Sequence, residues 1–537
     1  MQLPVVHQRY RMTTKRSVFW LTVLVTILVS GLPLFNLIQL ALSRIELSLF
    51  DTSLVRIIWN TFLIAALTTF FSLLLGTFCG FVLCRTNLFL KKGIKSFLLY
   101  PYIIPSIIIA IGWAILANPS VGLLKEILPG INIYSIGGIV FVEALYWYTF
   151  VMLNISNVLE NIDGSLEESA RMCGAGIFRV FFTITLPLLR PALIGSSILV
   201  FLCSISSFAV PAIIGGPGRI TVLTTKIYQW IKIGSPNALS QAMMLSVPIV
   251  VLAFGLGYIS EKWLNRKSYA TLGGKQTRKL EINLRHWRLP MTSVFILFSV
   301  LAIGMPLLTV LVTSLMKVYG HWDLSLDNYR WVLMRKDMQQ AILNSLLLAF
   351  GGGILIVFLS FFIAYYREKT RYRFRNLMVT FASLPYAAPG TILAFAILFS
   401  FLGSPAYFLL LFAYVAKYLN YGLRVISPAM SNVDKSLEEA SLMCGASWFR
   451  TLGSIWVPIL KGTFSTALFL LIAPLFSELT MSVILSAADF PTVGLRLFHL
   501  QEYESPFLAS VLAVVILFLV LGLNFLVKRL SRGRLGV

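Results

Sequence analysis

The sequence predicts an all-α polytopic membrane protein of about twelve transmembrane helices, arranged as two tandem six-helix repeats in the same orientation. The composition is the first reason: 58% of the 537 residues are hydrophobic and 12% are charged, whereas a soluble domain carries about 25% charged residues. The second reason is the regular recurrence of long apolar segments, and the third is a polar motif that occurs twice. This composition excludes a soluble globular enzyme and a disordered chain.

The apolar segments are long enough to cross a bilayer, which takes about 20 residues per helix. The first follows Arg9, Arg11, Lys15 and Arg16, and it is too long for the core of a signal peptide. The tenth contains Lys417 and follows the ninth after a very short gap. The predicted spans are 17–42, 57–83, 96–116, 137–158, 191–210, 240–260, 290–315, 341–366, 377–402, 405–424, 463–486 and 506–528.

The placement of Lys and Arg predicts the orientation. If the N-terminus lies inside and the spans alternate, 32 of the 44 Lys and Arg residues fall in inside segments and 11 in outside segments. We therefore expect a multi-pass protein of the inner membrane with both termini in the cytoplasm. The positive-inside bias explains the net charge of +23 without a nucleic-acid partner.

An internal duplication divides the chain. The windows 163–190 and 434–461 share 14 identities over 28 residues, at an offset of 271. Asn60 and Asn344, near the starts of the second and eighth spans, are 284 residues apart. The predicted parts are 1–56 (tail, first span and outer loop), 57–260 (first transmembrane unit), 261–289 (basic linker with lipid contact), 290–340 (seventh span and outer loop), 341–528 (second transmembrane unit) and 529–537 (basic tail).

The duplicated window predicts two short helices beneath the membrane. Ser165-Leu-Glu-Glu168 and Ser436-Leu-Glu-Glu439 have the pattern of a capping box, which starts a helix. Gly174 and Gly445 stand where a helix C-terminus requires a positive φ. We expect a second helical stretch that ends at Pro187 or Pro458, just before the next span.

These windows resemble the "EAA" loop of the permeases of binding-protein-dependent ABC importers. Glu168-Ser169-Ala170 is followed by Gly174 and by Ile184-Thr-Leu-Pro187, and Glu439-Ala440-Ser441 is followed by Gly445 and by Ile455-Trp-Val-Pro458. The first copy has Ser169 where the pattern has Ala, and the second copy has Ser441 for Ala and Val457 for Leu. The resemblance covers both halves and implies the type I importer permease fold.

The resemblance also implies that each loop is a coupling loop, to which a cytoplasmic ATPase binds. Two ATPase copies and an extracytoplasmic solute-binding protein are the implied partners. The chain lacks a GxxxxGK[ST] phosphate-binding loop, so we expect a non-enzymatic subunit that binds no cofactor, with ATP on the partner. The implied docking residues are Glu168, Ala170, Gly174 and Pro187 in the first loop, and Glu439, Ser441, Gly445 and Pro458 in the second.

Ionisable residues inside spans are candidates for the translocation pathway. They are Glu143 in the fourth span, Lys417 in the tenth and Glu478 in the eleventh. Because the fourth and tenth spans are equivalent in the repeat, Glu143 and Lys417 could face each other; an ordinary ion pair or a group reaching the interface is the alternative. The aromatic residues around Glu143 fit helix packing, and the scattered Cys and His residues form no metal-ligand pattern.

Two further segments bear on the substrate. Ser207–Pro217 and the stretch from Phe476 to Thr480 resemble segments of fused ferric-iron permeases, which makes ferric iron the first expected substrate. Thiamine, phosphonate and polyamine permeases share the architecture and remain alternatives. A secondary transporter driven by an ion gradient is the alternative from a different class, although it needs no paired docking loops.

Overall fold

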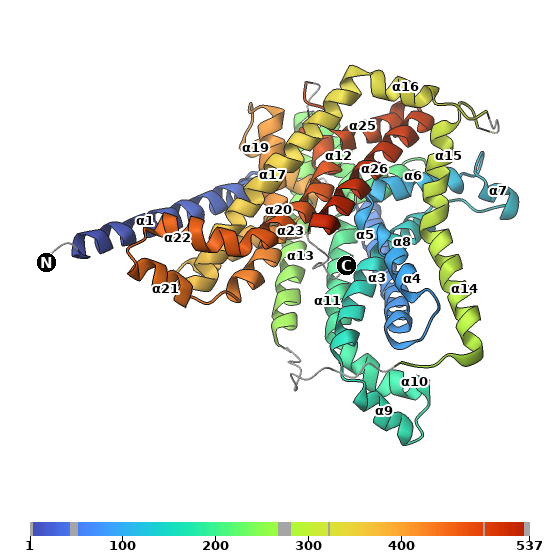
Figure 1. Cartoon of the computed structure of the whole chain (residues 1–537). Coiled ribbons are helices and arrows are strands. Elements are labelled where there is room, and N and C mark those ends of the chain that lie inside the picture. The colour runs from blue at the N-terminus through green and yellow to red at the C-terminus, as the bar shows by residue number, and fades with distance from the viewer. Residues whose placement is uncertain (1–3, 43–51, 267–280, 320–322, 487–488, 531–537) are drawn as a thin grey trace.

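The computed structural model describes residues 4–42, 52–266, 281–319, 323–486 and 489–530 (Figure 1). Within these ranges the secondary structure is helical, apart from one isolated β-bridge between Thr86 and Ile282. Ten helices are long and apolar enough to cross a membrane, and two bent helix pairs bring the number to twelve if each pair is one crossing. The predicted count of about twelve is confirmed on that basis.

The first half is built on three mutually packed helices, α3 (Thr52–Arg85), α8 (Ile136–Asn161) and α11 (Leu186–Ile205). A Cβ atom at Gly76 of α3 would lie 2.5 Å from the Cβ of Val151 on α8. Glycine therefore allows the two backbones to approach closely, as small residues do between membrane helices. The other elements of this half are α4 (Lys91–Leu98), α5 (Tyr100–Ile103), α6 (Ser106–Leu116), α7 (Leu124–Ile127), α9 (Ser165–Met172), α10 (Ile177–Val180), α12 (Leu223–Ile233) and α13 (Pro236–Arg266).

The second half repeats this arrangement with α17 (Lys336–Lys369), α20 (Ala406–Ser431) and α23 (Val457–Phe476). The predicted tenth span, which contains Lys417, is confirmed as α20. The other elements of this half are α14 (Arg288–Ser299), α15 (Met305–Leu315), α16 (Asp327–Met334), α18 (Arg375–Ala387), α19 (Gly390–Ser400), α21 (Ser436–Met443), α22 (Trp448–Thr451), α24 (Ser482–Leu485), α25 (Val493–His499) and α26 (Pro506–Leu530).

Matching hydrogen bonds confirm the duplication. The side-chain amide of Asn60 donates to the carbonyl of Thr221 at 3.5 Å, and that of Asn344 donates to the carbonyl of Pro491 at 2.9 Å. The hydroxyl of Thr61, next to Asn60, accepts from the backbone N–H of Leu223, the first residue of α12. The hydroxyl of Ser345, next to Asn344, accepts from the backbone N–H of Val493, the first residue of α25. The two asparagines thus hold α12 and α25 in equivalent places.

The third and ninth spans are bent, whereas the sequence predicted unbroken helices at 96–116 and 377–402. The pair Lys91–Ile103 and Ser106–Leu116 bends by 101°, and the pair Arg375–Tyr386 and Gly390–Ser400 bends by 110°. Pro105 and Pro389 stand at the breaks, each preceded by a residue in the extended conformation. Proline disfavours the helical conformation in the residue before it, which explains why both helices stop there.

The first span of each half packs on the opposite half. Before the first half's three-helix core come α1 (Pro4–Thr26), a short π-helical turn (Ile27–Gly31) and α2 (Leu32–Leu42). Helix α1 contacts α17 and α18, and α2 contacts α19. In return, α15 of the second half packs on α6 of the first half as well as on α26. The two halves therefore exchange a helical span.

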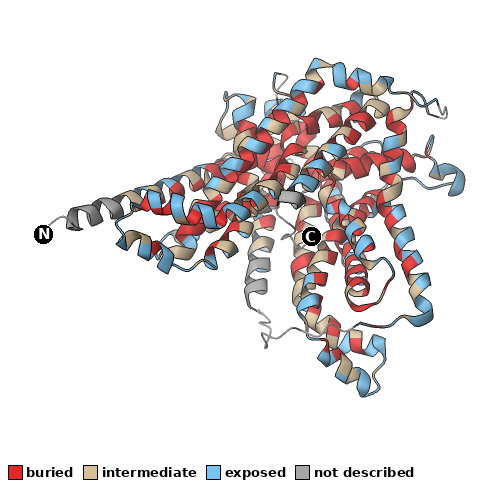
Figure 2. Cartoon of the chain, viewed as in Figure 1, coloured by how far each residue is buried: buried red, intermediate tan, exposed pale blue. Residues whose placement is uncertain are grey.

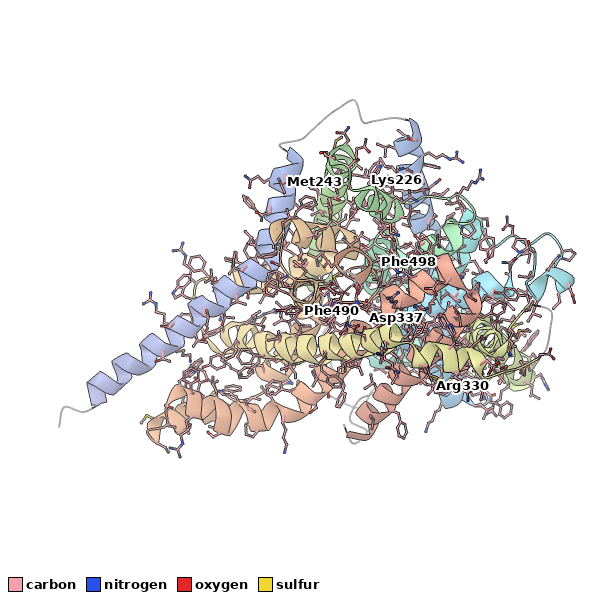
Figure 3. All side chains as sticks on the ribbon, turned by 90° about the horizontal axis from the view of Figure 1, so that it is seen from above. Lys226, Met243, Arg330, Asp337, Phe490 and Phe498 are labelled. Carbon is pink, nitrogen blue, oxygen red and sulfur yellow. The ribbon has the colours of Figure 1, made fainter. Side chains whose placement is uncertain are left out.

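The two repeated loops lie at equivalent ends of their halves, α9 against Arg85 at the end of α3 and α21 against Tyr365 near the end of α17; we call these ends the loop end. The other ends of the two halves meet where Lys232, in the last turn of α12, donates to the hydroxyl of Tyr503 at 3.0 Å. Phe498 of α25, labelled in Figure 3, also contacts Phe208 and Tyr228 of the first half, at ring-centroid distances of 5.7 and 6.1 Å. Since equivalent ends meet, the halves run in the same direction, as the sequence predicted.

Parts of two sequence predictions fall outside the described residues. The linker residues Lys275, Arg278 and Lys279 lie within 267–280, and the basic tail lies mostly within 531–537. The described end of the linker is held at the loop end, because the N–H of Ile282 donates to the carbonyl of Arg85 at 2.7 Å.

Candidate functional site

The two repeated loops have the same backbone conformation. Helices α9 and α21 each span eight residues and end before a glycine with positive φ, at +84° for Gly174 and +87° for Gly445. The N–H of the residue after each glycine reaches back five residues, from Ala175 to Ala170 at 3.1 Å and from Ala446 to Ser441 at 3.2 Å. This is the Schellman arrangement that closes a helix C-terminus, so the expectation for both glycines is confirmed.

The predicted capping boxes are absent from both loops. Helices α9 and α21 already begin at Ser165 and Ser436, and neither has a side-chain hydrogen bond at its N-cap. Asp163 and Asp434 take that place, because each carboxylate accepts from the N–H of the serine two residues later, at 3.0 and 2.9 Å. This backbone hydrogen bond lowers the pKa of both aspartates below the usual value of 3.8.

The second helical stretch of each loop does not end at the proline, contrary to the prediction. Helices Ile177–Ile205 and Trp448–Phe476 run without interruption from the loop into the span. A π-helical turn, Phe181–Thr185 or Leu452–Trp456, precedes Leu186-Pro187 or Val457-Pro458. Proline lacks an N–H and crowds the carbonyl four residues earlier; the wider turn accommodates that defect while the helix continues. Each loop is therefore rigidly joined to a span.

A buried acidic residue anchors the first loop to its own half. Glu167 of α9 and Arg85 at the end of α3 form an ion pair at 3.1 Å, with side chains only 1% and 2% exposed. The other carboxylate oxygen of Glu167 accepts from the hydroxyl of Thr185 at 2.7 Å. The sequence predicts a role for the next residue, Glu168, but not for Glu167.

The second loop has an equivalent acid with different partners. Glu438 of α21 accepts from the phenol of Tyr365 at 2.6 Å and pairs with Lys15 of α1 at 3.0 Å. The indole of Trp448 donates to the same phenol at 3.0 Å. Because Lys15 lies at the start of the first span, the N-terminal helix of the first half holds the repeated loop of the second half.

Apart from the buried acids, each loop presents an exposed surface that faces away from the rest of the protein. Glu168 is partly exposed, and Glu439 is exposed with only a surface ion pair to Lys435 at 3.2 Å. Two methionines, each two residues before a glycine, are almost fully exposed, Met172 at 89% and Met443 at 88%. Figure 2 shows both loops as largely exposed segments at the edge of the molecule. An exposed apolar and acidic surface of this kind is typical of a docking site.

The remaining docking candidates lie beside this surface. Ala170 and Ser441 are partly exposed, and the hydroxyl of Ser441 contacts that of Thr451 at 2.9 Å. Pro187 is partly exposed and Pro458 is exposed, each just inside its span. All eight candidates therefore lie in two equivalent structures, and their role in docking stays a prediction.

The two candidate acids of the pathway are buried. Glu143 of α8 is 1% exposed and accepts from the hydroxyls of Thr68 at 3.4 Å and Ser204. Its second oxygen, Oε1, has no hydrogen-bond partner among the described residues. Glu478 is 7% exposed and accepts from the N–H groups of Met481 at 2.9 Å and Ser482 at 3.2 Å, so it caps the N-terminus of α24.

Lys417 does not pair with Glu143. Its ammonium group donates to the carbonyls of Tyr386, at 3.2 Å, and Ala388. These carbonyls lie at the C-terminal end of α18, at the break of the ninth span, where they lack partners within the helix. Lys417 therefore caps a half-helix, and no ion pair among the described residues joins it to Glu143.

Comparisons with known proteins agree with this architecture. A family model described as "binding-protein-dependent transport system inner membrane component" matches residues 72–268 and 356–534, one match in each half. A putative ferric transport system permease protein, FbpB 1, of Haemophilus influenzae is 25% identical over 458 residues, which cover 81% of this chain and 71% of that protein.

Two further relatives differ in how much of the chain they match. A second protein of H. influenzae, the Fe(3+)-transport system permease protein FbpB 2, is 22% identical over 96% of this chain and 99% of its own length. The molybdenum transport system permease protein ModB of Escherichia coli K12 is 32% identical, but over 39% of this chain and 93% of its own. The FbpB relatives thus match across both halves, whereas ModB matches less than half of the chain.

Proposed function

This chain belongs to the family of binding-protein-dependent transport system inner membrane components, and we propose that it is the permease subunit of an ATP-driven importer of ferric iron. Two relatives that match most of this chain, FbpB 1 and FbpB 2, carry ferric transport in their names. The molybdenum permease matches less than half of the chain. Ferric iron is therefore the cargo that the comparisons favour over thiamine, phosphonates and polyamines.

The duplicated coupling loop is the observation that supports an ATP-driven mechanism. Two equivalent loops at one end of the bundle would receive two copies of a cytoplasmic ATPase, which would supply the ATP site. Each loop is a rigid unit, because its buried acid and its continuous helix fix it to the spans. ATP-driven closure of the two ATPase copies would draw the loops together and move both sets of spans as bodies.

The direction of transport follows from this assignment. The loop end would lie in the cytoplasm together with both termini, in agreement with the basic residues there. An extracytoplasmic binding protein would dock at the opposite end and deliver its ligand into the space between the halves. Import then depends on the different affinities of ATP and of the binding protein for the two conformations.

Reconstitution tests this proposal. The chain is placed in proteoliposomes with its cognate ATPase and binding protein, and uptake of radioactive ferric iron is measured with and without ATP. We expect uptake only when all three proteins and ATP are present. Iron uptake driven by a proton or sodium gradient without the ATPase would show a secondary transporter instead. ATP-dependent uptake of molybdate or thiamine, with none of iron, would keep the mechanism and replace the cargo.

A further inference from the structure

Two equivalent junctions lie at the loop end, where each exchanged first span starts beside a bent span of the other half. In one junction, the N–H of Phe89, two residues before α4, donates to the hydroxyl of Thr292 on α14 at 3.2 Å. In the other, the rings of Trp20 on α1 and Phe374, just before α18, lie 5.7 Å apart between centroids. We call these the α4–α14 junction and the α1–α18 junction. Each junction therefore joins the two halves.

The same hydrogen bond supports the bent span at both junctions. The ammonium group of Lys91 donates to the carbonyl of Thr86 at 2.9 Å, and the guanidinium of Arg375 donates to the carbonyl of Thr370. Lys91 and Arg375 are 284 residues apart, and so are Thr86 and Thr370. The same offset separates the two asparagines that support α12 and α25. The junctions are thus equivalent parts of the duplicated fold.

Each junction gathers basic side chains from two distant parts of the chain. At the α4–α14 junction, the side-chain amide of Asn87 donates to that of Asn283 at 3.0 Å, and the N–H of Leu284 donates back to Asn87 at 3.0 Å. None of the six basic residues at the junctions forms an ion pair among the described residues. They are Lys92, Arg285 and Arg288 at the α4–α14 junction, and Arg16, Arg371 and Arg373 at the α1–α18 junction. Each junction thus presents three positive charges that no described carboxylate neutralises.

One of these cations has a buried donor without an acceptor. The guanidinium of Arg288 lies 3.7 Å from the ring centroid of Phe89. Its Nε atom is buried and has no hydrogen-bond partner in the part of the chain that the structure describes. A buried donor on a charged group is costly when no acceptor meets it. An anionic oxygen at this point would therefore stabilise the folded protein.

Exposed apolar side chains lie next to the cations and continue along the exchanged spans. Trp287 and Leu90 are 69% and 74% exposed at the α4–α14 junction, and Trp20 is 47% exposed at the α1–α18 junction. The exposed apolar residues that follow are Leu21, Leu24 and Leu28 on the first span, and Leu289, Val294 and Leu297 on the seventh. Tryptophan beside Lys and Arg is typical of the boundary between a membrane and water. A lipid therefore fits this surface better than a soluble protein does.

We propose that each junction binds the phosphate group of one anionic phospholipid, whose acyl chains lie along the exposed apolar face of the exchanged span. Arg and Lys donate strong hydrogen bonds to phosphate oxygens, and clusters of basic residues at a membrane surface recognise anionic lipids. The lipid would contact both the exchanged span and the half that receives it, so it would hold the exchange in place. The leaflet is the cytoplasmic one under the orientation proposed above, and the binding does not depend on the cargo.

Native mass spectrometry of the full chain tests the two sites. Protein stripped of lipid is mixed with phosphatidylglycerol or with phosphatidylcholine of the same acyl chains, and the bound lipids are counted. We expect two phosphatidylglycerol molecules to stay bound and phosphatidylcholine to be lost. Removal of the three cations of a junction should weaken binding there about a hundredfold, so each triple variant should keep one lipid. The variants are Lys92→Gln with Arg285→Gln and Arg288→Gln, and Arg16→Gln with Arg371→Gln and Arg373→Gln.

A matched control separates the sites from net charge. Lys125→Gln with Arg219→Gln and Arg330→Gln removes three exposed cations remote from the loop end, where Figure 3 labels Arg330, and it should keep both lipids. Arg285→Gln alone changes one exposed side chain and should weaken binding about fivefold, even if a triple variant folds poorly.

Three results would overturn the proposal. The first is equal retention of phosphatidylcholine, and the second is unchanged binding of phosphatidylglycerol in Arg285→Gln and both triple variants. The third is displacement of the lipid by soluble glycerol 1-phosphate, which would show a site for free phosphate compounds instead. Because no measurement here involves iron or ATP, these results leave the proposed function intact.

Discussion

The guanidinium nitrogen Nε of Arg85 and the carboxylate oxygen Oε2 of Glu167 lie 3.1 Å apart in an almost completely buried ion pair. Arg85 ends α3, and Glu167 lies in the first coupling loop. The pair therefore joins the exposed loop to the central helix of its half. A force on the loop reaches the spans through this contact as well as through the continuous helix that follows.

We expect Glu167→Ala to destabilise the protein by about 3–5 kcal/mol, because removal of one partner leaves a buried charge uncompensated. Thermal unfolding of the purified protein in detergent measures this. The matched control is Glu168→Ala in the next position, which is partly exposed and forms no ion pair among the described residues. Equal effects at both positions would contradict the anchoring role of Glu167.

The double variant Glu168→Lys and Glu439→Lys should abolish ATP-dependent uptake, while the protein still inserts and folds. Both side chains reach the surface, so the change reverses charge at the docking surface without touching the core. Uptake and co-purification of the ATPase are the measurements. Glu160→Lys is the control, since Glu160 makes only a surface pair with Lys95 at the same end. Unchanged uptake in the double variant would refute the docking role of the two acids.

Gly174→Val and Gly445→Val should each impair coupling, because φ values of +84° and +87° place a β-branched residue in the left-handed region. The expected strain is about 1–3 kcal/mol per site. A Cβ at either glycine meets no neighbour within 4 Å, so backbone strain alone is tested. Gly176→Ala and Gly453→Ala are the controls, since they also meet open space but have no positive φ. Iron-stimulated ATP hydrolysis without uptake is the expected signature.

The first turn of each coupling loop should loosen in acid. Hydrogen bonds from Ser165 and Ser436 lower the pKa of Asp163 and Asp434 in the folded protein. A lowered folded pKa means that the stabilisation is present above the unfolded value of 3.8 and is lost as the pH falls through the folded value. Hydrogen-exchange protection of the two serine amides, corrected for intrinsic exchange, should fall in that range. Asp163→Ala should lose the protection of Ser165 at all pH values, and Asp163→Asn should keep part of it.

Local sequence patterns predicted most of the fold and part of the site. Apolar length and charge placement located the spans, and the repeat predicted equal directions for the halves. The positive φ of Gly174 and Gly445 followed from residue type and position alone. The bent spans did not follow, because apolar length is the same for a straight and a broken helix; Pro105 and Pro389 carried the only local signal.

The features that the sequence did not predict correctly depend on distant contacts or on competing local hydrogen bonds. Glu167 and Glu168 are neighbours of the same type, and only the position of Arg85 decides which one is buried. Lys15 lies 423 residues from Glu438, which no local pattern reveals. The capping boxes were wrong because Asp163 and Asp434 compete successfully for the helix N-termini.

The exchange of first spans has a consequence for the assembly of the protein. Helix α2 lies against α19, and α15 lies against α6, so each half is incomplete without a helix supplied by the other. Cleavage of the chain between the two halves would leave these helix contacts intact. Two separately synthesised half-chains should therefore recombine into one working complex, whereas a lone half without its counterpart should expose two unmatched helix faces and be degraded.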